Sequence, residues 1–344
     1  MKYNLADVCV RLSSGKGIPA KMIESSGRFP VYGGNGLRGY TEQSNFDGEC
    51  AIIGRQGAFC GNVRFFSGKA YMTEHAIVAV ANKDHNTRYL AYLLSTMSLG
   101  HLSAQSAQPG LSVKTLSKVT VDLPSKEEQD KAVSILSSLE DKIAENSKIN
   151  DNLQQQAFVL FDKLMIDADN NDCTLSDYAY LNPKRTLAKN QIARSIDMSQ
   201  LSTSGAFPSG WDMKPFNGGM RFSNGDTLLA RITPCLENGK TAFIDFLDKD
   251  EIAFGSTEYI VLSPKSSVPP EMMYCLARYP AFVDYAVKNM NGSSGRQRVS
   301  TETIGQFQLP KFDKQDLLEF RALIAPMFLK MRYNSIENMR LAKL

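Results

Sequence analysis

Three glycine-rich loops, 32–40 (YGGNGLRGY), 54–64 (GRQGAFCGNVR) and 291–300 (NGSSGRQRVS), carry side chains that can hydrogen-bond to nucleic-acid bases. Glycine lets a backbone approach a ligand closely. Arg pairs with guanine, and Asn or Gln with adenine, through two hydrogen bonds each, whereas Ser, Tyr and backbone N–H groups suit phosphate. The candidate DNA-binding residues in these loops, in the segment 103–112 and at two further arginines are Asn35, Arg38, Tyr40, Arg55, Gln56, Arg64, Gln108, Arg221, Arg231, Ser293, Arg296, Gln297 and Arg298.

Loops rich in Gly, Asn and Ser are also ordinary turns, and that interpretation stays open for each loop taken singly. The runs Gly-Arg-Gln-Gly at 54–57 and Arg-Gln-Arg at 296–298 favour contacts with bases.

Motifs of the common catalytic and cofactor sites are absent. The segment 238–241 (NGKT) resembles the end of a phosphate-binding loop, but the glycine required five residues before Gly239 is Pro234. The patterns GxSxG, HExxH and Asp/Asn-Pro-Pro-aromatic do not occur, and the six Cys and three His have no metal-ligand spacing. We therefore predict a binding protein with no catalytic residues, no metal and no cofactor.

Composition limits how the chain could hold DNA. Its 39 Lys and Arg against 36 Asp and Glu give a net charge of +3, too little to bind nucleic acid by charge alone. We expect other subunits to supply much of the phosphate contact. No apolar run approaches the roughly 20 residues that span a bilayer, and the N-terminus MKYNLADVCV lacks a signal-peptide core. We therefore expect a cytoplasmic protein without membrane contact.

The elements that must position these loops are short strands and two long helices. Apolar runs such as ECAIIG, HAIVAV and EYIVLSP, separated by Gly, Asn and Pro, predict strands. Segments 125–166 and about 313–341 predict helices that begin at Ser125 and Asp313. Pro326 lies inside the second segment and should kink or split that helix.

Both helical segments carry an apolar seam with steps of three and four residues. The first seam is Leu136, Leu139, Ile143, Asn146, Asn150, Leu153, Ala157, Leu160 and Leu164, and the second is Leu317, Phe320, Ile324, Met327, Met331, Asn334, Asn338 and Leu341. A shift of 188 residues superposes the two Asn pairs. Because a buried Asn disfavours registers that leave its amide unpaired, the four Asn residues should fix the pairing register of the helices.

The two halves of the chain also agree outside the helices. The order DGECAIIGRQG, TEHAIVAV, TRYLAYLL, LSVKTLSKVTVDLP in the first half returns as NGDTLLARITP, TEYIVLSP, PEMMYCLA, VSTETIGQFQLP in the second. In this comparison Thr73-Glu74 matches Thr257-Glu258, Leu123-Pro124 matches Leu309-Pro310, and Gln129-Asp130 matches Gln315-Asp316. The sequence therefore predicts a tandem duplication of one globular unit and one helix.

The order of these segments resembles the specificity subunit of type I restriction-modification systems. Segment 29–80 (FPVYGGNGLRGYTEQSNFDGECAIIGRQGAFCGNVRFFSGKAYMTEHAIVAV) and the LSVKTLSKVTVDLPSKEEQ segment carry most of the likeness. The resemblance implies an α+β fold with two similar, mostly-β target recognition domains, at 1–124 and 169–310. It also implies two spacer helices, at 125–168 and 311–344, packed as an antiparallel coiled coil about a pseudo-two-fold axis.

The resemblance further implies a non-catalytic, sequence-specific subunit that recognises a bipartite target in double-stranded DNA. It would bind two methyltransferase subunits and, through them, restriction subunits. The helix pair would act as a ruler that fixes the gap between the half-sites.

Two other functions stay open. One is a carbohydrate- or protein-binding module on helical stalks, which would use similar Gly, Asn and Tyr loops but is normally secreted. The other is a nuclease in which Asp245 and Asp248 hold a metal.

Overall fold

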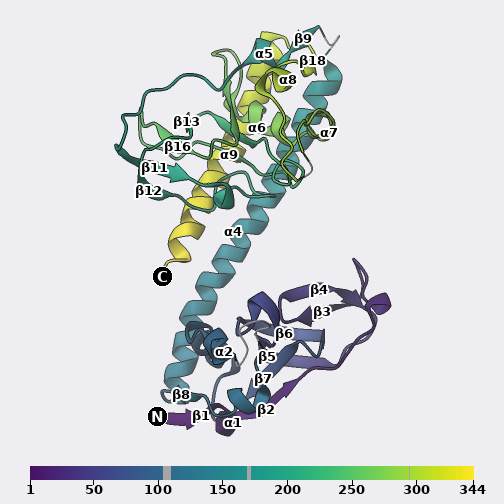
Figure 1. Cartoon of the computed structure of the whole chain (residues 1–344), viewed down its shortest axis with the longest axis vertical. Helices are drawn as coiled ribbons and strands as arrows, with labels where there is room; N and C mark the ends of the chain where they lie inside the picture. The colour runs from purple at the N-terminus through teal and green to yellow at the C-terminus, as the bar shows by residue number, and fades with distance from the viewer. Residues whose placement is uncertain (104–109, 169–171, 294) are drawn as a thin grey trace. The chain divides into compact units, whose positions relative to one another are not determined.

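The computed structural model describes residues 1–103, 110–168, 172–293 and 295–344 (Figure 1). The chain divides into two compact units, Met1–Ser138 and Leu139–Leu344, and the division falls inside the long helix α4 (Lys126–Asp167). None of the helices in the described ranges is both long and apolar enough to cross a membrane.

The first unit is built on a six-stranded sheet in the order β2-β7-β5-β6-β3-β4, in which only β3 and β6 are parallel neighbours. Its elements before α4 are β1 (Lys2–Asn4), α1 (Leu5–Val8), β2 (Cys9–Ser14), η1 (Ala20–Met22), β3 (Phe29–Gly33), β4 (Gly36–Thr41), β5 (Phe46–Gly54), η2 (Gly57–Phe59), β6 (Val63–Met72), β7 (Ala76–Ala81), α2 (Thr87–Thr96), η3 (Leu99–Leu102), α3 (Val113–Leu116) and β8 (Thr120–Asp122). Strand β1 pairs with β8, which joins the two ends of this unit.

The second unit has two four-stranded sheets, β10-β17-β14-β15 and β12-β11-β16-β13. Its elements after α4 are β9 (Cys173–Thr174), α5 (Leu175–Tyr178), β10 (Ala179–Leu181), β11 (Ile192–Ile196), η4 (Met198–Gln200), β12 (Asp212–Pro215), β13 (Met220–Phe222), β14 (Thr227–Ala230), β15 (Thr241–Phe243), β16 (Ala253–Gly255), β17 (Tyr259–Pro264), α6 (Pro270–Arg278), α7 (Pro280–Lys288), α8 (Thr301–Gly305), β18 (Gln308–Leu309) and α9 (Lys314–Leu341). Helices α6 and α7 are separate because Pro280 begins α7.

The two units share one topology. Strands β10, β17, β14 and β15 pair in the same order and sense as β2, β7, β5 and β6. The parallel pairing of β11 with β16 repeats that of β3 with the end of β6, and β13 corresponds to the start of β5. Strands β5 and β6 of the first unit are long and continuous. In the second unit the counterpart of β5 is divided at 223–226 into β13 and β14, and the counterpart of β6 is divided at 244–252 into β15 and β16. The second unit therefore forms two sheets.

Backbone hydrogen bonds fix the structural register of the repeat. Arg55 N–H donates to His75 O at 3.0 Å, and Arg231 N–H donates to Glu258 O at 3.0 Å. Arg231 is therefore the counterpart of Arg55, and Glu258 is the counterpart of His75 rather than of Glu74. The sequence match of Thr73-Glu74 with Thr257-Glu258 is wrong by one residue.

Two further dipeptide matches are also out of register. The caps Ser112 and Ser300 of α3 and α8 lie 188 residues apart, as do the helix starts at Ser125 and Asp313. The Leu-Pro and Gln-Asp matches are each 186 residues apart, so two residues separate them from the structural register. Gln129 is fully buried and accepts from the Asn86 N–H at 2.9 Å. Its counterpart at a shift of 188 is the buried Leu317, not the exposed Gln315.

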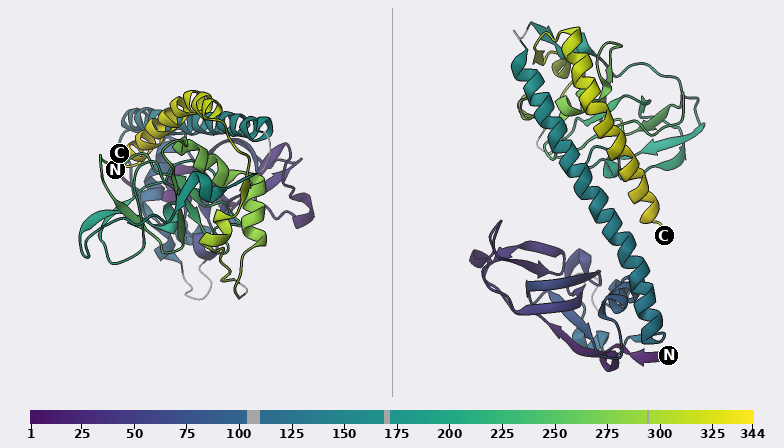
Figure 2. Two further views of the ribbon diagram at one scale, coloured as in Figure 1. Left: turned by 90° about the horizontal axis from the view of Figure 1, so that it is seen from above. Right: turned by 180° about the vertical axis from the view of Figure 1, so that it is seen from behind.

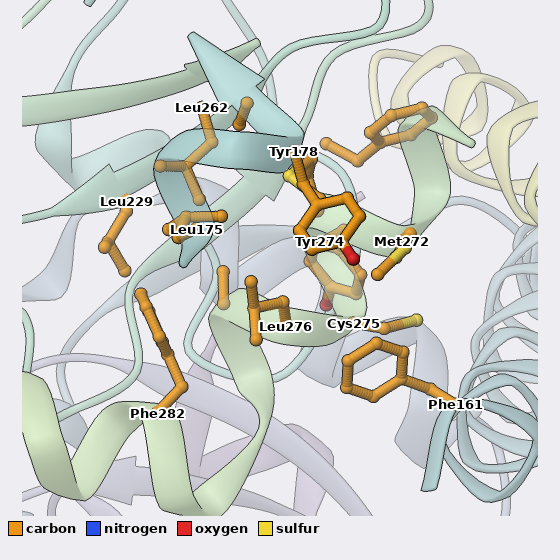
Figure 3. Packing of buried hydrophobic residues seen from close by; sticks show 14 of the residues in the cluster. Phe161, Leu175, Tyr178, Leu229, Leu262, Met272, Tyr274, Cys275, Leu276 and Phe282 are labelled. Atoms are coloured by element: carbon orange, nitrogen blue, oxygen red, sulfur yellow. The ribbon is translucent and has the colours of Figure 1, made fainter. Parts of the chain in front are cut away.

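The largest buried cluster of the second unit surrounds α6. Figure 3 shows Met272, Tyr274, Cys275 and Leu276 of α6 with Leu229, Leu262, Leu175, Tyr178, Phe282 and Phe161. Phe161 comes from α4, so this helix contributes to the core of the unit. The buried Tyr274 hydroxyl donates to Gln154 Oε1 at 3.0 Å, and Gln154 Nε2 donates to Ser204 O at 2.7 Å. These bonds satisfy the polar groups that α4 brings into the core.

Helices α4 and α9 lie side by side in opposite directions (Figure 2). Asn146 bonds with Asn338 near the end of α9, whereas Phe161 packs on Phe320 near its start, with ring centroids 6.3 Å apart. Helix α9 runs unbroken through the exposed Pro326, so of the two predicted effects of this proline, a kink or a split, the split does not occur. The antiparallel coiled coil that the family resemblance implies is confirmed.

The buried residues of α9 follow the predicted seam with one addition. Leu317, Phe320, Ile324, Met331 and Asn334 are buried as predicted. The additional residue, Phe328, packs edge-on against Phe243 and Tyr274 of the globular part. Helix α9 therefore serves both the helix pair and the core.

Candidate nucleic-acid interface

The segment YGGNGLRGY is a β-hairpin rather than an open loop. Gly33 pairs with Gly36 across the turn, and Gly36 has φ +97°, a conformation that favours glycine. A Cβ on Gly34 would lie 2.9 Å from His75 O and 3.4 Å from Arg55 N, so the turn contacts the backbone at the end of β5 and the start of β7. The hairpin therefore brings Asn35 close to Arg55.

Two arginines flank this turn. A Cβ on Gly36 would lie 3.0 Å from Nη1 of Arg64, and one on Gly33 would lie 2.7 Å from Cδ of Arg38. Arg38, Arg64 and Asn35 are exposed, and Tyr40 is half-buried on β4. Burial raises the pKa of Tyr32, and the Tyr40 hydroxyl adds to this rise while Arg64 opposes it. Tyr32 is therefore a neutral hydrogen-bonding group beside the arginines.

Arg55 and Gln56 follow β5 directly. Arg55 is half-buried and its Nη1 donates to Glu74 O at 3.4 Å. Gln56 is exposed and its backbone forms a bridge with Gly110. We call Asn35, Arg38, Arg55, Gln56 and Arg64 the first polar cluster. Gln108 lies outside the described residues.

The second unit has a polar cluster at the corresponding place. Arg298 binds Glu258 through two nitrogens, with Nε to Oε2 at 2.9 Å and Nη2 to Oε1 at 2.8 Å. Arg231 Nε lies 4.0 Å from Glu258 Oε2 and is buried without a hydrogen-bond partner among the described residues. Hydrogen bonds from Arg298, followed by its charge and that of Arg231, hold the pKa of Glu258 below its usual value although burial opposes them. We call Arg231, Glu258 and Arg298 the second polar cluster.

The other predicted residues of the second unit do not all join this cluster. Arg296 and Ser293 are exposed, with the Arg296 N–H donating to Ser293 O at 3.0 Å. Gln297 is half-buried and its carbonyl accepts from the Thr233 N–H at 3.0 Å. Arg221 lies on β13 with its guanidinium 5.6 Å from the Phe216 ring centroid. No contact joins Arg221 to the second polar cluster in the described part of the chain.

Sequence reasoning missed Glu258 as a partner of the arginines. The dipeptide Thr257-Glu258 stood out only as a repeated marker of a strand, with no sign that its carboxylate meets Arg298. Its counterpart His75 lies 3.3 Å from Glu74 Oε1 through Nε2. The signal available in the sequence was a carboxylate directly before a buried strand, across from an Arg-Gln-Arg loop.

The four Asn residues of the helix seam form two hydrogen-bonded pairs across the helices. Asn146 Nδ2 donates to Asn338 Oδ1 at 2.9 Å, and Asn334 Nδ2 donates to Asn150 Oδ1 at 2.8 Å. Asn146 and Asn334 are fully buried, at 0% and 1% exposure.

The acidic pair considered for a nuclease is held in ion pairs. Asp245 accepts from Arg332 Nη1 at 3.1 Å, and Asp248 accepts from Arg194 Nη2 at 2.9 Å. In the ranges that the structure describes, no three His, Cys, Asp or Glu side chains come together to hold a metal ion. The geometry gives the nuclease hypothesis no support.

A family model for the type I restriction modification DNA specificity domain matches residues 1–155. The EcoprrI specificity subunit of Escherichia coli is 38% identical over 147 residues, which are 41% of this chain and 37% of that relative. The EcoAI specificity subunit of Escherichia coli is 34% identical over 133 residues, 37% of this chain and 22% of that relative. The N-terminal part of the chain is therefore similar to the DNA specificity domain of type I restriction-modification systems.

The likeness in fold extends over the whole chain. A crystal structure of a type I restriction-modification S subunit from M. genitalium has a TM-score of 0.67 at 15% identity, covering 99% of this chain and 92% of that one. This likeness shows that the chain has the fold of that S subunit. The matches to the two Escherichia coli specificity subunits cover less than half of either relative's length.

Proposed function

We propose that this chain is a non-catalytic specificity subunit of a type I restriction-modification system, which recognises a bipartite DNA target and recruits adenine methyltransferase and restriction subunits to it. Residues 1–124 and 169–310 would each read one half of the target. Residues 125–168 and 311–344 would be the two spacer helices. The observation that carries the proposal is the repeat of one strand topology, with an arginine, Arg55 or Arg231, at the end of the same central strand in each copy.

The residues proposed to contact DNA lie around these two arginines. In the first copy they are Asn35, Arg38, Tyr40, Arg55, Gln56, Arg64 and Gln108, and in the second they are Arg221, Arg231, Ser293, Arg296, Gln297 and Arg298. Exposed Arg and Gln side chains beside glycine turns suit hydrogen bonds to base edges. Different polar residues around one shared arginine suit two half-sites of different sequence.

Partner subunits are part of the proposal because the chain is nearly neutral. A net charge of +3 supports few phosphate contacts, and the salt dependence of binding scales with their number. Two methyltransferase subunits would supply the remaining contacts and the catalytic sites. The restriction subunits would join through them. This arrangement explains why a chain with no catalytic motif would belong to a modifying complex.

The experiment that tests the proposal maps methylated adenines genome-wide in cells that carry the methyltransferase gene with and without this chain. We expect a two-part motif, separated by a fixed gap, that disappears when the chain is absent. A continuous motif, or one that persists without the chain, would refute the proposed function.

A further inference from the structure

The backbone around Arg298 is held on two sides. Arg298 and Asn291 exchange two backbone hydrogen bonds, each 2.9 Å long, and Arg298 also forms a backbone bridge with Ile232. The next residue, Val299, donates its N–H to Arg231 O at 3.0 Å. These backbone hydrogen bonds fix the position of the Arg298 Cα beside the end of β14. They do so independently of the contacts that the Arg298 side chain makes.

The Arg298 side chain is then oriented by Glu258. Nε and Nη2 form a fork that holds the carboxylate, and Nη1 donates to Arg296 O at 3.0 Å. A guanidinium has five N–H donors, and these contacts use three of them. No other described residue accepts from Arg298, and its side chain is 39% exposed. One N–H on each terminal nitrogen remains for a ligand.

An ion pair of this kind could instead serve only to close the loop onto β14, and the repeat tests this explanation. In the first unit Gly110 stands where the second has Arg298, and His75 stands where it has Glu258. The backbone bridge persists there between Gln56 and Gly110, and Leu111 N–H donates to Arg55 O at 2.8 Å. This fold therefore makes the same backbone connection without the arginine–carboxylate pair.

We propose that Arg298 reads a guanine in the half-site of the second unit, with Glu258 as the positioning residue that aims its free donors. Two N–H groups on the terminal nitrogens match the O6 and N7 acceptors of guanine in the major groove. A guanidinium held by a carboxylate loses less rotational freedom on binding than a free one. The first unit has neither residue at this position, so the corresponding base of its half-site is read by other side chains. This inference rests on the proposed function.

The test uses the full chain in complex with its methyltransferase partner and duplexes carrying every single-base change of the second half-site. Arg298→Lys keeps the positive charge but has no fork. We expect it to lose about tenfold or more of the preference for guanine at one base pair, which is the usual worth of a bidentate contact. Preference at the other positions and recognition of the first half-site should stay unchanged. Glu258→Gln should weaken discrimination at the same base pair.

The matched control is Arg194→Lys, because Arg194 in the same unit also binds carboxylates, those of Asp248 and Glu251. We expect this variant to leave the base preferences as in the wild type. If Arg298→Lys keeps its guanine preference, or loses affinity equally for every duplex, the inference is overturned while the proposed function stands. If the wild-type complex itself shows no preference among the duplexes, the proposed function fails. Retained recognition of the first half-site shows that a variant has folded.

Discussion

The side-chain amide of Asn334 donates to the side-chain oxygen of Asn150, 2.8 Å away on the neighbouring helix. The repeat relates each residue of α4 to the residue of α9 that lies 188 positions later. Under this correspondence Asn334 becomes Asn146 and Asn150 becomes Asn338, and these two residues form the equivalent bond. The same correspondence exchanges the bond from Asn150 to Ser335 Oγ, at 3.2 Å, with that from Asn338 to Ser147 Oγ, at 3.3 Å. The hydrogen bonds of the helix pair therefore retain the two-fold symmetry of the duplication.

Replacing Asn334 with Leu should destabilise the second unit. The side-chain oxygen of Asn150 loses its donor in a half-buried site, and we expect a cost of about 1 kcal/mol. The apolar seam taken alone predicts a gain, since Leu suits a helix seam better than Asn. Urea unfolding followed by helical signal measures the change.

A double-mutant cycle of Asn334→Leu and Asn150→Leu isolates this bond. We expect a coupling of about 1 kcal/mol between the two sites. Asn152 on the exposed face of α4 is the matched control, and Asn152→Leu should show no coupling to Asn334→Leu. Additive effects of Asn334→Leu and Asn150→Leu would contradict the pairing of these two residues.

The pair of Glu258 with Arg298 predicts a dependence of stability on pH. Arg298 lowers the pKa of Glu258 in the folded chain, so the folded state binds fewer protons than the unfolded state. The pair's contribution is complete above pH 4.5, the ordinary Glu value, and is lost as the pH falls through the folded pKa. Wild type should therefore exceed Glu258→Gln in unfolding temperature at pH 7, and the difference should shrink as the pH falls below 4.5.

Asp245 gives a control of opposite sign. Burial raises the pKa of its carboxyl, although Arg332 opposes the rise, so the folded state binds more protons than the unfolded one. Its favourable contribution is present below the ordinary Asp value of 3.8 and is lost as the pH rises through the folded pKa. Asp245→Asn should therefore gain on wild type between pH 3 and pH 7. If the unfolding temperatures of Glu258→Gln and Asp245→Asn, each relative to wild type, change in the same direction with pH, the opposite pKa shifts assigned to Glu258 and Asp245 are wrong.

Arg185 and Asp226 form a buried ion pair. Replacing one partner alone should lower the free energy of unfolding far more than replacing both. Their atoms approach to 2.8 Å, and the side chains are 15% and 2% exposed. Asp226→Asn leaves a buried guanidinium without its counter-charge, and we expect a loss of about 3 kcal/mol. The double variant with Arg185→Met should recover most of this loss in thermal unfolding.

The exposed pair Glu127 with Lys131 on α4 serves as the comparison for Asp226, since its side chains are 80% and 71% exposed. Glu127→Gln should shift the unfolding temperature little, because solvent screens such pairs. Equal effects of Asp226→Asn and Glu127→Gln would mean that burial of the Arg185 pair does not govern its energy.

Gly34→Ala should impair recognition of the first half-site only. The added methyl would lie 2.9 Å from the carbonyl oxygen of His75, so the hairpin turn must move away from Arg55. We expect affinity for the first half-site to fall about tenfold, the size of one lost bidentate contact. Gly210→Ala is the matched control because a methyl there meets nothing within 4 Å. If Gly34→Ala leaves the affinity for the first half-site unchanged, Asn35 and its neighbours in the hairpin turn do not contact DNA.

Local sequence signals predicted the elements whose patterning is strong. Strands β7 and β17 and the second half of β5 are apolar runs, and the seams of α4 and α9 repeat over several turns, so the hydrophobic pattern specifies these elements. The sequence predicts an open binding loop at 32–40, where the structure has the β3–β4 hairpin, because the glycines there hide the strand alternation. The breaks in the strands of the second unit depend on long-range pairing and left no local signal.

Register errors had a different cause. The dipeptides Leu-Pro and Gln-Asp match between the halves by letter, but strand pairing and helix caps, not identity, set the structural correspondence. The same reason hid Glu258, whose contact with Arg298 joins segments 40 residues apart. Side-chain partners across such distances depend on the packed fold, which no short motif encodes.

Inserting one heptad into α4 tests the proposed ruler. An insertion after Leu139 lies before Asn146 and leaves the two Asn pairs intact, while lengthening this continuous helix by about 10 Å at 1.5 Å per residue. We expect the gap between half-sites to grow by roughly three base pairs with both half-site sequences unchanged. Deleting residues 136–142 should shorten the gap by the same amount. Methylation maps of the two variants measure the gap directly, and an unchanged gap in both would show that the helix pair does not set the spacing.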